Sequence, residues 1–121
     1  MAGTFSTTPN ACFVNLDLIA WVDEGTSSQY PNELLQFFSY VERAWVKMGG
    51  LPHNGKMYGF YDPTNSDQSS YTPPFNPNFL SFITQQRITR KAPVAAFNSY
   101  RKTVDPNGLF YNQYLQALLG S

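Results

Sequence analysis

The feature that most constrains the fold is a long helical pattern between Pro31 and Met48. Pro31 suits the first turn of a helix, where its missing N–H would be unpaired anyway. Gly49 and Gly50 supply a left-handed cap at the other end, and Pro52 prevents the helix from continuing. Apolar residues at three- and four-residue spacing predict one buried stripe along it. The stripe consists of Leu34, Phe37, Phe38, Val41, Ala44, Trp45 and Met48.

The segment before this helix, Cys12 to Val22, has the pattern of a β-strand. Its even positions are all apolar, whereas its odd positions are mixed and include Asn15 and Asp17. This alternation predicts a sheet with one fully buried face. The other face, with Asn15 and Asp17, fits either solvent or the wall of a pocket. Residues 57–61 predict a second, shorter extended segment.

Three further helices are predicted in the second half of the chain. The first begins at Pro77, with Asn76 as its cap, and runs to about residue 90. The second opens at Pro93, and the third lies within residues 109–119. The residues predicted to face inward on the first two are Phe79, Leu80, Ile83 and Ile88, then Val94, Phe97, Tyr100 and Val104.

Composition places the chain of 121 residues, at most one domain, among globular proteins. Aromatic residues are abundant at 17% and charged residues sparse at 13%. This fits either an aromatic-rich core or a surface that another domain covers. The net charge is zero, so no nucleic-acid partner is predicted. Five basic residues still gather after residue 70, on either a solvated helix face or a surface for an acidic partner or cofactor phosphate: Arg87, Arg90, Lys91, Arg101 and Lys102.

The remaining compositional signals concern redox state and targeting. Cys12 is the only cysteine, which excludes an internal disulfide and favours a small buried side chain. Residues 1–10 are small and polar, as in a tail or linker, and have no signal-peptide pattern. No apolar run reaches the length of a membrane span, so none is predicted. Localisation stays open.

His53, the only histidine, lies in the short motif Pro52-His53-Asn54-Gly55-Lys56 directly after the long helix. An imidazole titrates near neutrality and can accept a proton from a substrate hydroxyl or hydrogen-bond to it. The ammonium group of Lys56 can stabilise negative charge nearby. A lone histidine here is also typical of a plain surface turn. One His and one Cys without a carboxylate cluster are too few ligands for a protein-only metal site, so none is predicted.

In their order and spacing these segments resemble the C-terminal portion of the FAD-linked oxidases of the vanillyl-alcohol oxidase superfamily. The resemblance is closest to the alditol, aldonolactone and sterol oxidase branches. There, a strand ending at a Trp leads to a long helix, a Gly-rich turn and Arg-Pro-His-Trp-Gly-Lys. The matching parts here are Phe13 to Trp21, Pro31 to Met48 and Gly49 to Lys56. The closing family motif, Asp-Pro-x-Gly followed by an aromatic residue and an Asn, matches residues 105–112, where a type I turn is predicted.

The resemblance implies roles for four residues. His53 and Lys56 would be catalytic and would line the substrate side of the flavin ring. Phe110 and Asn112 would bind the cofactor, Asn112 by positioning the flavin-side backbone. The implied cofactor is FAD, and the implied substrate is a small-molecule alcohol.

The resemblance also implies the fold and the domain organisation. We expect an α+β fold in residues 11–121, with a small antiparallel sheet packed by two to four helices. It would combine part of the cap domain with the C-terminal helices that return to the flavin domain. Residues 63–93 would be an insertion relative to the compact sugar-alcohol oxidases.

The chain departs from the family pattern in ways that bear on function. Leu51 and Asn54 replace the usual Arg and Trp, and the Glu-x-Arg pair and the FAD-cradling N-terminal subdomain have no counterpart in this sequence. We therefore predict a C-terminal part of an FAD-dependent oxidoreductase that oxidises an alcohol or lactol by hydride transfer. It would be inactive alone and need an FAD-binding domain as its partner. The alternative is a stand-alone, non-catalytic interaction module derived from this fold.

Overall fold

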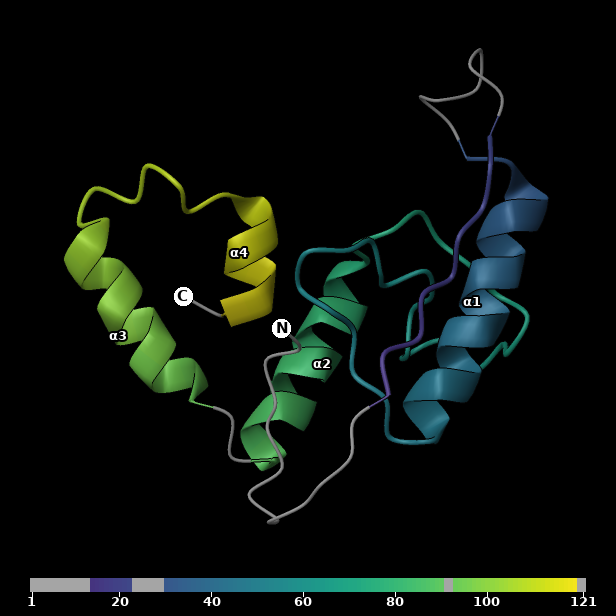
Figure 1. Cartoon of the computed structure of the whole chain (residues 1–121), viewed down its shortest axis with the longest axis horizontal. Helices are drawn as coiled ribbons and strands as arrows, with labels where there is room; N and C mark the ends of the chain where they lie inside the picture. The colour runs from purple at the N-terminus through teal and green to yellow at the C-terminus, as the bar shows by residue number, and fades with distance from the viewer. Residues whose placement is uncertain (1–13, 23–29, 91–92, 120–121) are drawn as a thin grey trace.

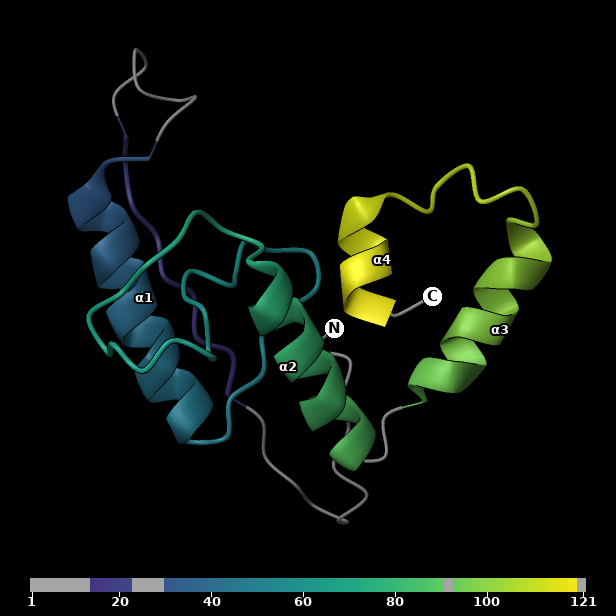
Figure 2. The same cartoon turned by 180° about the vertical axis from the view of Figure 1, so that it is seen from behind.

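The structure, a computed structural model, describes residues 14–22, 30–90 and 93–119. Within these ranges the regular elements are four α-helices, and all four were predicted. Figures 1 and 2 show α2 near the middle, with α1 on one side and α4 and then α3 on the other. The helices are α1 (Asn32–Lys47), α2 (Pro77–Thr89), α3 (Val94–Val104) and α4 (Gln113–Leu119).

The C-terminal end of α1 is formed as its sequence predicts, whereas Pro31, predicted in the first turn, lies one position earlier, at the N-cap. The carbonyl of Pro31 accepts the first hydrogen bonds of the helix, from Leu34 and Leu35. At the other end Gly49 adopts a left-handed φ of +88°. The N–H of Gly50 then donates to the carbonyl of Trp45 at 2.8 Å, which completes a Gly-based cap.

The buried face of α1 differs from the predicted stripe. Leu35, Phe38 and Ser39 are buried, whereas Phe37 is half exposed and Met48 is largely exposed. The face is rotated because polar side chains of α1 bond to loops on this side of the helix. Ser39, for example, donates to the carbonyl of Ser70 at 3.0 Å. The helix prediction is confirmed, but the predicted stripe is partly wrong.

The predicted antiparallel sheet is wrong for the described part of the chain, which contains helices but no strand. Residues 14–22 run beside α1 in both views without forming a strand (Figures 1 and 2). Val14, Ile19 and Trp21 are largely exposed, and only Leu18 packs, half-buried, against buried residues of the core. Because the buried face of the predicted strand is missing, the observed fold class is all-α rather than α+β.

A physical reason for the missing sheet lies in residues 58–60, whose carbonyl groups, together with the N–H groups of Gly59 and Phe60, already have partners. The carboxylate of Glu42 accepts the N–H groups of Gly59 and Phe60, each at 2.7 Å. The carbonyl groups of residues 58–60 accept hydrogen bonds from backbone N–H groups within residues 72–76. A neighbouring strand would need these same donors and acceptors. The segment with the alternating pattern before α1 therefore finds no free row of backbone donors and acceptors in residues 58–60 with which to pair.

The core consists of two small clusters of buried side chains. The larger joins α2, α4 and residues 58–61, and the smaller joins α1 to Phe60. Most buried aromatic side chains come from the short segment 58–61 and from α2. The larger cluster contains Tyr58, Tyr61, Phe79, Leu80, Ile83 and Leu118, and the smaller contains Leu35, Phe38 and Phe60.

Helix α2 is capped and oriented largely as predicted. The side chain of Asn76 accepts the N–H groups of Asn78 and Phe79 and so caps the helix start. The predicted inward residues Phe79, Leu80 and Ile83 are fully buried. Ile88 is half exposed, so that position was predicted wrongly.

Helix α3 forms where predicted, but none of its residues is buried. Phe97, Tyr100 and Val104, the predicted inward face, are all more than half exposed. The turn after α3 is confirmed: the N–H of Gly108 donates to the carbonyl of Asp105 at 3.1 Å. The arm formed by α3 and this turn therefore has helical order without a buried face.

Three predictions lie outside the described residues: the tail at 1–10, the burial of Cys12 and the setting of Lys91. No helix in the described ranges is long and apolar enough to cross a membrane.

Candidate active site

His53 lies in a tight exposed turn between α1 and the core segment 58–61. Its carbonyl accepts the N–H of Lys56 at 3.1 Å, and its ring Nδ1 accepts the N–H of Gly55 at 2.9 Å. A Cβ at position 55 would lie 3.1 Å from the ring Cε1. Gly55 therefore supplies both the hydrogen bond that orients the imidazole and the space that the ring occupies.

Two arginines at the C-terminal end of α2 hold the loop that carries His53: Arg87 in the last turn and Arg90 at the C-cap. The Nη2 atom of Arg87 donates to the carbonyl of Pro52 at 3.2 Å and to the side-chain oxygen of Asn54 at 2.6 Å. The Nη1 atom of Arg90 donates to the carbonyl of Gly49 at 2.7 Å. The loop is thus tied to α2 at its start and on both sides of the histidine.

Phe110 and Asn112, the predicted cofactor-binding residues, lie in the segment that joins α3 to α4. The carboxylate of Asp105 accepts the N–H groups of Leu109 and Phe110, at 2.7 and 3.0 Å. The ring of Phe110 is largely exposed. Asn112 caps α4, because its side-chain oxygen accepts the N–H of Leu115 at 3.0 Å.

His53 and Lys56 share one turn, whereas Phe110 and Asn112 share another, on a different part of the chain. A hydrogen bond of 2.6 Å between the hydroxyl groups of Tyr58 and Tyr114 connects the segments that follow the two turns. Burial and this hydrogen bond raise the pKa of Tyr58 far above its usual value, so the phenol stays neutral at physiological pH.

Glu42 places a half-buried carboxyl group on the inward side of α1. Burial raises its pKa to about 7, against the opposing effects of the two backbone N–H groups that it accepts and of the neighbouring Arg43. The guanidinium of Arg43 lies 4.0 Å above the ring of Tyr61 and also donates to the carbonyl of Ser70. Together these two residues fix the position of the 58–61 segment against α1.

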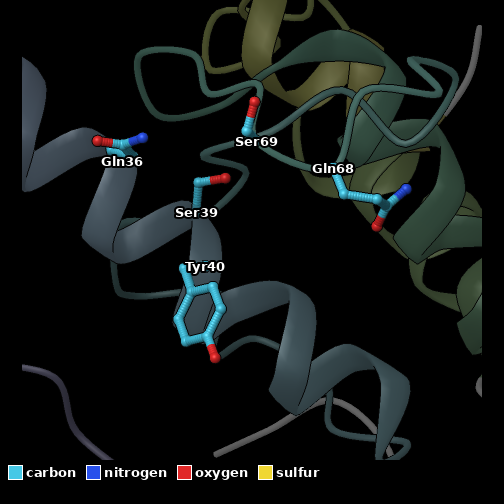
Figure 3. Close-up of a pocket in the computed structure, with 5 residues that line it drawn as sticks. All are labelled: Gln36, Ser39, Tyr40, Gln68 and Ser69. Carbon is cyan, nitrogen blue, oxygen red and sulfur yellow. The ribbon is translucent and has the colours of Figure 1, made fainter.

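Two open hollows lie away from the predicted site residues. One, of about 290 Å³, lies between α1 and the 62–70 loop (Figure 3). The other, of about 320 Å³, lies among the ends of α2, α3 and α4. Neither is lined by His53, Lys56, Phe110 or Asn112. The first is lined by Gln36, Ser39, Tyr40, Gln68 and Ser69, and the second by Ile88, Val94, Ala95, Asn98 and Leu119.

A metal centre finds no support in the described ranges, where no three His, Cys, Asp or Glu side chains gather in a suitable cluster. The groups whose contacts are defined in the His53 turn are the oriented imidazole and the backbone amides of Gly55 and Lys56.

The sequence analysis missed the structural roles of Glu42 and Arg87. Their spacing from neighbouring apolar residues indicates that both lie on the buried faces of their helices. Arg87 follows Leu80 and Ile83 at seven and four residues, which places it on the buried face of α2. Glu42 likewise follows Phe38 by four residues on the buried face of α1. Arg87 had been assigned either to a solvated helix face or to an acidic or phosphate-bearing partner, and its burial excludes the solvated face.

Comparison with known families matches residues 8–118 to the family described as D-arabinono-1,4-lactone oxidase. The match spans α1, α2, α3, all but the last residue of α4, the His53 turn and the turn before Asn112. No curated protein and no solved structure matches the chain.

Proposed function

Since the chain belongs to the D-arabinono-1,4-lactone oxidase family, we propose that it supplies the substrate-facing part of an FAD-dependent oxidase. The substrate class is an aldonolactone or a related small alcohol, oxidised at a hydroxyl-bearing carbon. The observation that carries the proposal is the oriented imidazole of His53 in an exposed turn.

In the proposed reaction the substrate carbon loses a hydride and its hydroxyl group loses a proton, which leaves a carbonyl. FAD supplies the acceptor for the hydride. Because Nδ1 accepts the N–H of Gly55, the neutral ring carries its hydrogen on Nε2. His53 is therefore assigned to donate a hydrogen bond from Nε2 to the substrate oxygen, and the hydroxyl proton leaves to water at the exposed turn. Lys56 stabilises the negative charge that develops on oxygen or on the cofactor.

The described residues fit one edge of a flavin rather than the whole cofactor. His53 and Lys56 lie in an exposed turn, and Phe110 presents an exposed ring. The two hollows are at or below the lower end of the size range of small-molecule pockets and are lined by other residues. We therefore assign most contacts with FAD to a separate flavin-binding domain.

The partner proposal is supported by the apolar surface near the second motif. Phe97, Tyr100, Val104, Leu109 and Phe110 are each more than half exposed on α3 and the following turn. Several large apolar side chains exposed on one arm are typical of a contact with another domain. We assign it to the flavin-binding domain, which would bring Phe110 and Asn112 to the cofactor.

The test combines the chain with the polypeptide that carries the flavin-binding half of the oxidase, whether encoded in the same gene or separately. FAD uptake is followed by flavin absorbance, and anaerobic addition of D-arabinono-1,4-lactone should then bleach the flavin. His53→Ala should abolish most of the bleaching but not FAD uptake. Ser66→Ala, in the exposed 62–70 loop, is the matched control and should leave both unchanged.

Three results would contradict the proposal. Stoichiometric FAD binding by the chain alone would remove the need for a partner. Wild-type bleaching in His53→Ala would reject the role of the imidazole. A mixture that takes up no FAD would favour the non-catalytic interaction module.

A further inference from the structure

We propose that Arg87 positions the imidazole of His53. It does so through hydrogen bonds to Pro52 and Asn54, the two residues that flank the histidine. The inference rests on the proposed function for its catalytic meaning. Its structural part, that Arg87 sets the orientation of the imidazole, stands on contacts within this chain.

The contacts of Arg87 converge on the histidine. Its side chain is only 5% exposed, although it lies near the C-terminal end of α2. A single nitrogen, Nη2, reaches the carbonyl of Pro52 and the side-chain oxygen of Asn54. The residue between these two is His53. The guanidinium therefore constrains the backbone immediately before the imidazole and the side chain immediately after it.

The surroundings of Arg87 indicate a role beyond stabilising the core. Both of its acceptors on the loop are neutral, and its buried Nε has no hydrogen-bond partner in the described part of the chain. A buried cation without a carboxylate partner is unfavourable compared with an apolar side chain of similar size. Arg87 also interacts with the hydroxyl group of buried Tyr58. What it adds for the His53 loop is the pair of bonds to Pro52 and Asn54.

Arg90, the C-cap residue of the same helix, provides an internal comparison. It donates to the carbonyl of Gly49, four residues before His53, and its bond is exposed to solvent. Arg90 therefore ties the start of the loop to α2 but does not act on the residues beside the imidazole. Loss of Arg90 and loss of Arg87 should have different effects on His53.

The experiment follows the imidazole of His53 by NMR in the isolated chain. Because His53 is the only histidine, its ring carbon and nitrogen signals need no assignment. The wild type should show one narrow set of ring signals, with an Nδ1 shift typical of an acceptor. Arg87→Gln and Asn54→Ala should broaden or split these signals and move the Nδ1 shift. Arg90→Gln, the matched control, should leave them unchanged.

Amide exchange of Gly55 gives a second readout of the same geometry, because its N–H donates to Nδ1. Exchange should accelerate by about tenfold in Arg87→Gln, the order expected when charge-assisted hydrogen bonds are lost. Arg87→Lys keeps the charge and one donor group, so it should restore part of the protection. A purely structural role for Arg87 would lower stability without this selective effect.

Arg87 is buried, so Arg87→Gln could prevent folding. Asn54→Ala removes one of the same hydrogen bonds at an exposed position, where the substitution is compatible with folding. If Arg87→Gln unfolds, Asn54→Ala alone decides the question. Unchanged His53 signals and unchanged Gly55 exchange in a folded variant would overturn the inference.

The outcome is separable from that of the proposed function. Disturbed His53 signals in Arg87→Gln, together with normal turnover in His53→Ala, would leave the positioning intact but reject the catalytic role. Unchanged His53 signals with lost turnover in His53→Ala would keep the function and reject Arg87 as the positioning residue.

Discussion

Two regions of the molecule use aromatic side chains in opposite ways. In the body, formed by α1, α2 and residues 57–76, Tyr58 and Phe79 are at most 2% exposed. In the arm, formed by α3 and residues 105–112, Phe97 is 53% exposed and Phe110 is 77% exposed. The family match spans both regions, so the difference does not separate a family-like part from an unrelated one.

The contrast shows that apolar periodicity predicts a helix more reliably than it predicts burial. Val94, Phe97, Tyr100 and Val104 form a regular stripe on α3, yet no residue of this helix is buried. Burial requires an opposing surface, which residues 58–61 and α4 give to α2. The corresponding surface for the arm is assigned above to the flavin-binding domain.

The largest effect should come from a matched pair of phenylalanine truncations. Phe79→Ala removes a fully buried ring and should reduce the free energy of unfolding by about 3–5 kcal/mol. Phe97→Ala removes a half-exposed ring and should change it by about 0.5 kcal/mol. Urea denaturation measures both. Equal losses would break the distinction between body and arm.

Glu42 should give the body a pH-dependent stability. Burial raises the folded-state pKa of this carboxyl group from 4.5 to about 7. The folded protein therefore binds the proton of Glu42 more tightly than the unfolded chain does. The stability gained from this is fully present below pH 4.5 and is lost as the pH rises through about 7. Linkage over such a shift corresponds to about 3 kcal/mol. Urea denaturation of the wild type should show decreasing stability from pH 5 to pH 8, apart from other titrating groups.

Glu42→Gln provides the comparison for this profile. The amide cannot ionise, so the difference in stability between variant and wild type should vary across the same pH window. Wild type and variant profiles that run parallel from pH 5 to pH 8 would show that Glu42 does not titrate there.

A smaller effect is expected at the junction between the body and α4. Tyr114→Phe removes one hydroxyl group and leaves that of Tyr58 without this partner, for a loss of about 1 kcal/mol. Tyr100→Phe, on the exposed side of α3, is the matched control and should be nearly neutral. Thermal unfolding followed by circular dichroism compares the two. A neutral Tyr114→Phe would mean that the tyrosine pair does not stabilise α4.

The smallest predicted effect concerns the arm alone. The guanidinium of Arg101 lies 3.8 Å above the ring of Tyr111. Arg101→Gln should reduce the free energy of unfolding by about 0.5–1 kcal/mol, as for a cation–π contact near the surface. Lys102→Gln controls for the loss of one positive charge. A loss of several kcal/mol for Arg101→Gln would show that the arm is more tightly organised than its exposure indicates.

The local signals of the sequence predicted the helices well. Pro31, Asn76 and Gly49 act through their own backbone and side-chain chemistry, so their roles do not depend on the rest of the fold. The same holds for the turn closed by Asp105 and Gly108. These features could be predicted because each capping or turn residue bonds to a group only a few residues away in the sequence.

The sheet could not be judged from local signals. Alternation in residues 14–22 is necessary for a half-buried strand, but pairing depends on donors and acceptors elsewhere in the chain. Those of Gly59 and Phe60 are taken by Glu42, which lies 17 and 18 residues earlier. The apolar periodicity of residues 14–22 cannot indicate that the Glu42 side chain accepts the N–H groups to which a neighbouring strand would bond.

The site was predicted in part for the same reason. The motif predicted that His53 and Lys56 lie in one loop after α1, and the structure places both in one turn, closed by the hydrogen bond from the N–H of Lys56 to the carbonyl of His53. The role of Arg87 depends on contacts with Pro52 and Asn54, more than thirty residues away in sequence. The catalytic and cofactor-binding roles of the four predicted residues stay predictions until the tests above.

The carboxylate of Glu42 has a consequence for self-association. Extended aromatic segments with open backbone groups can recruit strands from other molecules and start aggregation. Here Gly59 and Phe60 direct their N–H groups to Glu42, and the carbonyl groups of residues 58–60 are bonded to the 72–76 backbone. The central part of this aromatic segment therefore presents no free edge to a second chain, and loss of Glu42 would create one.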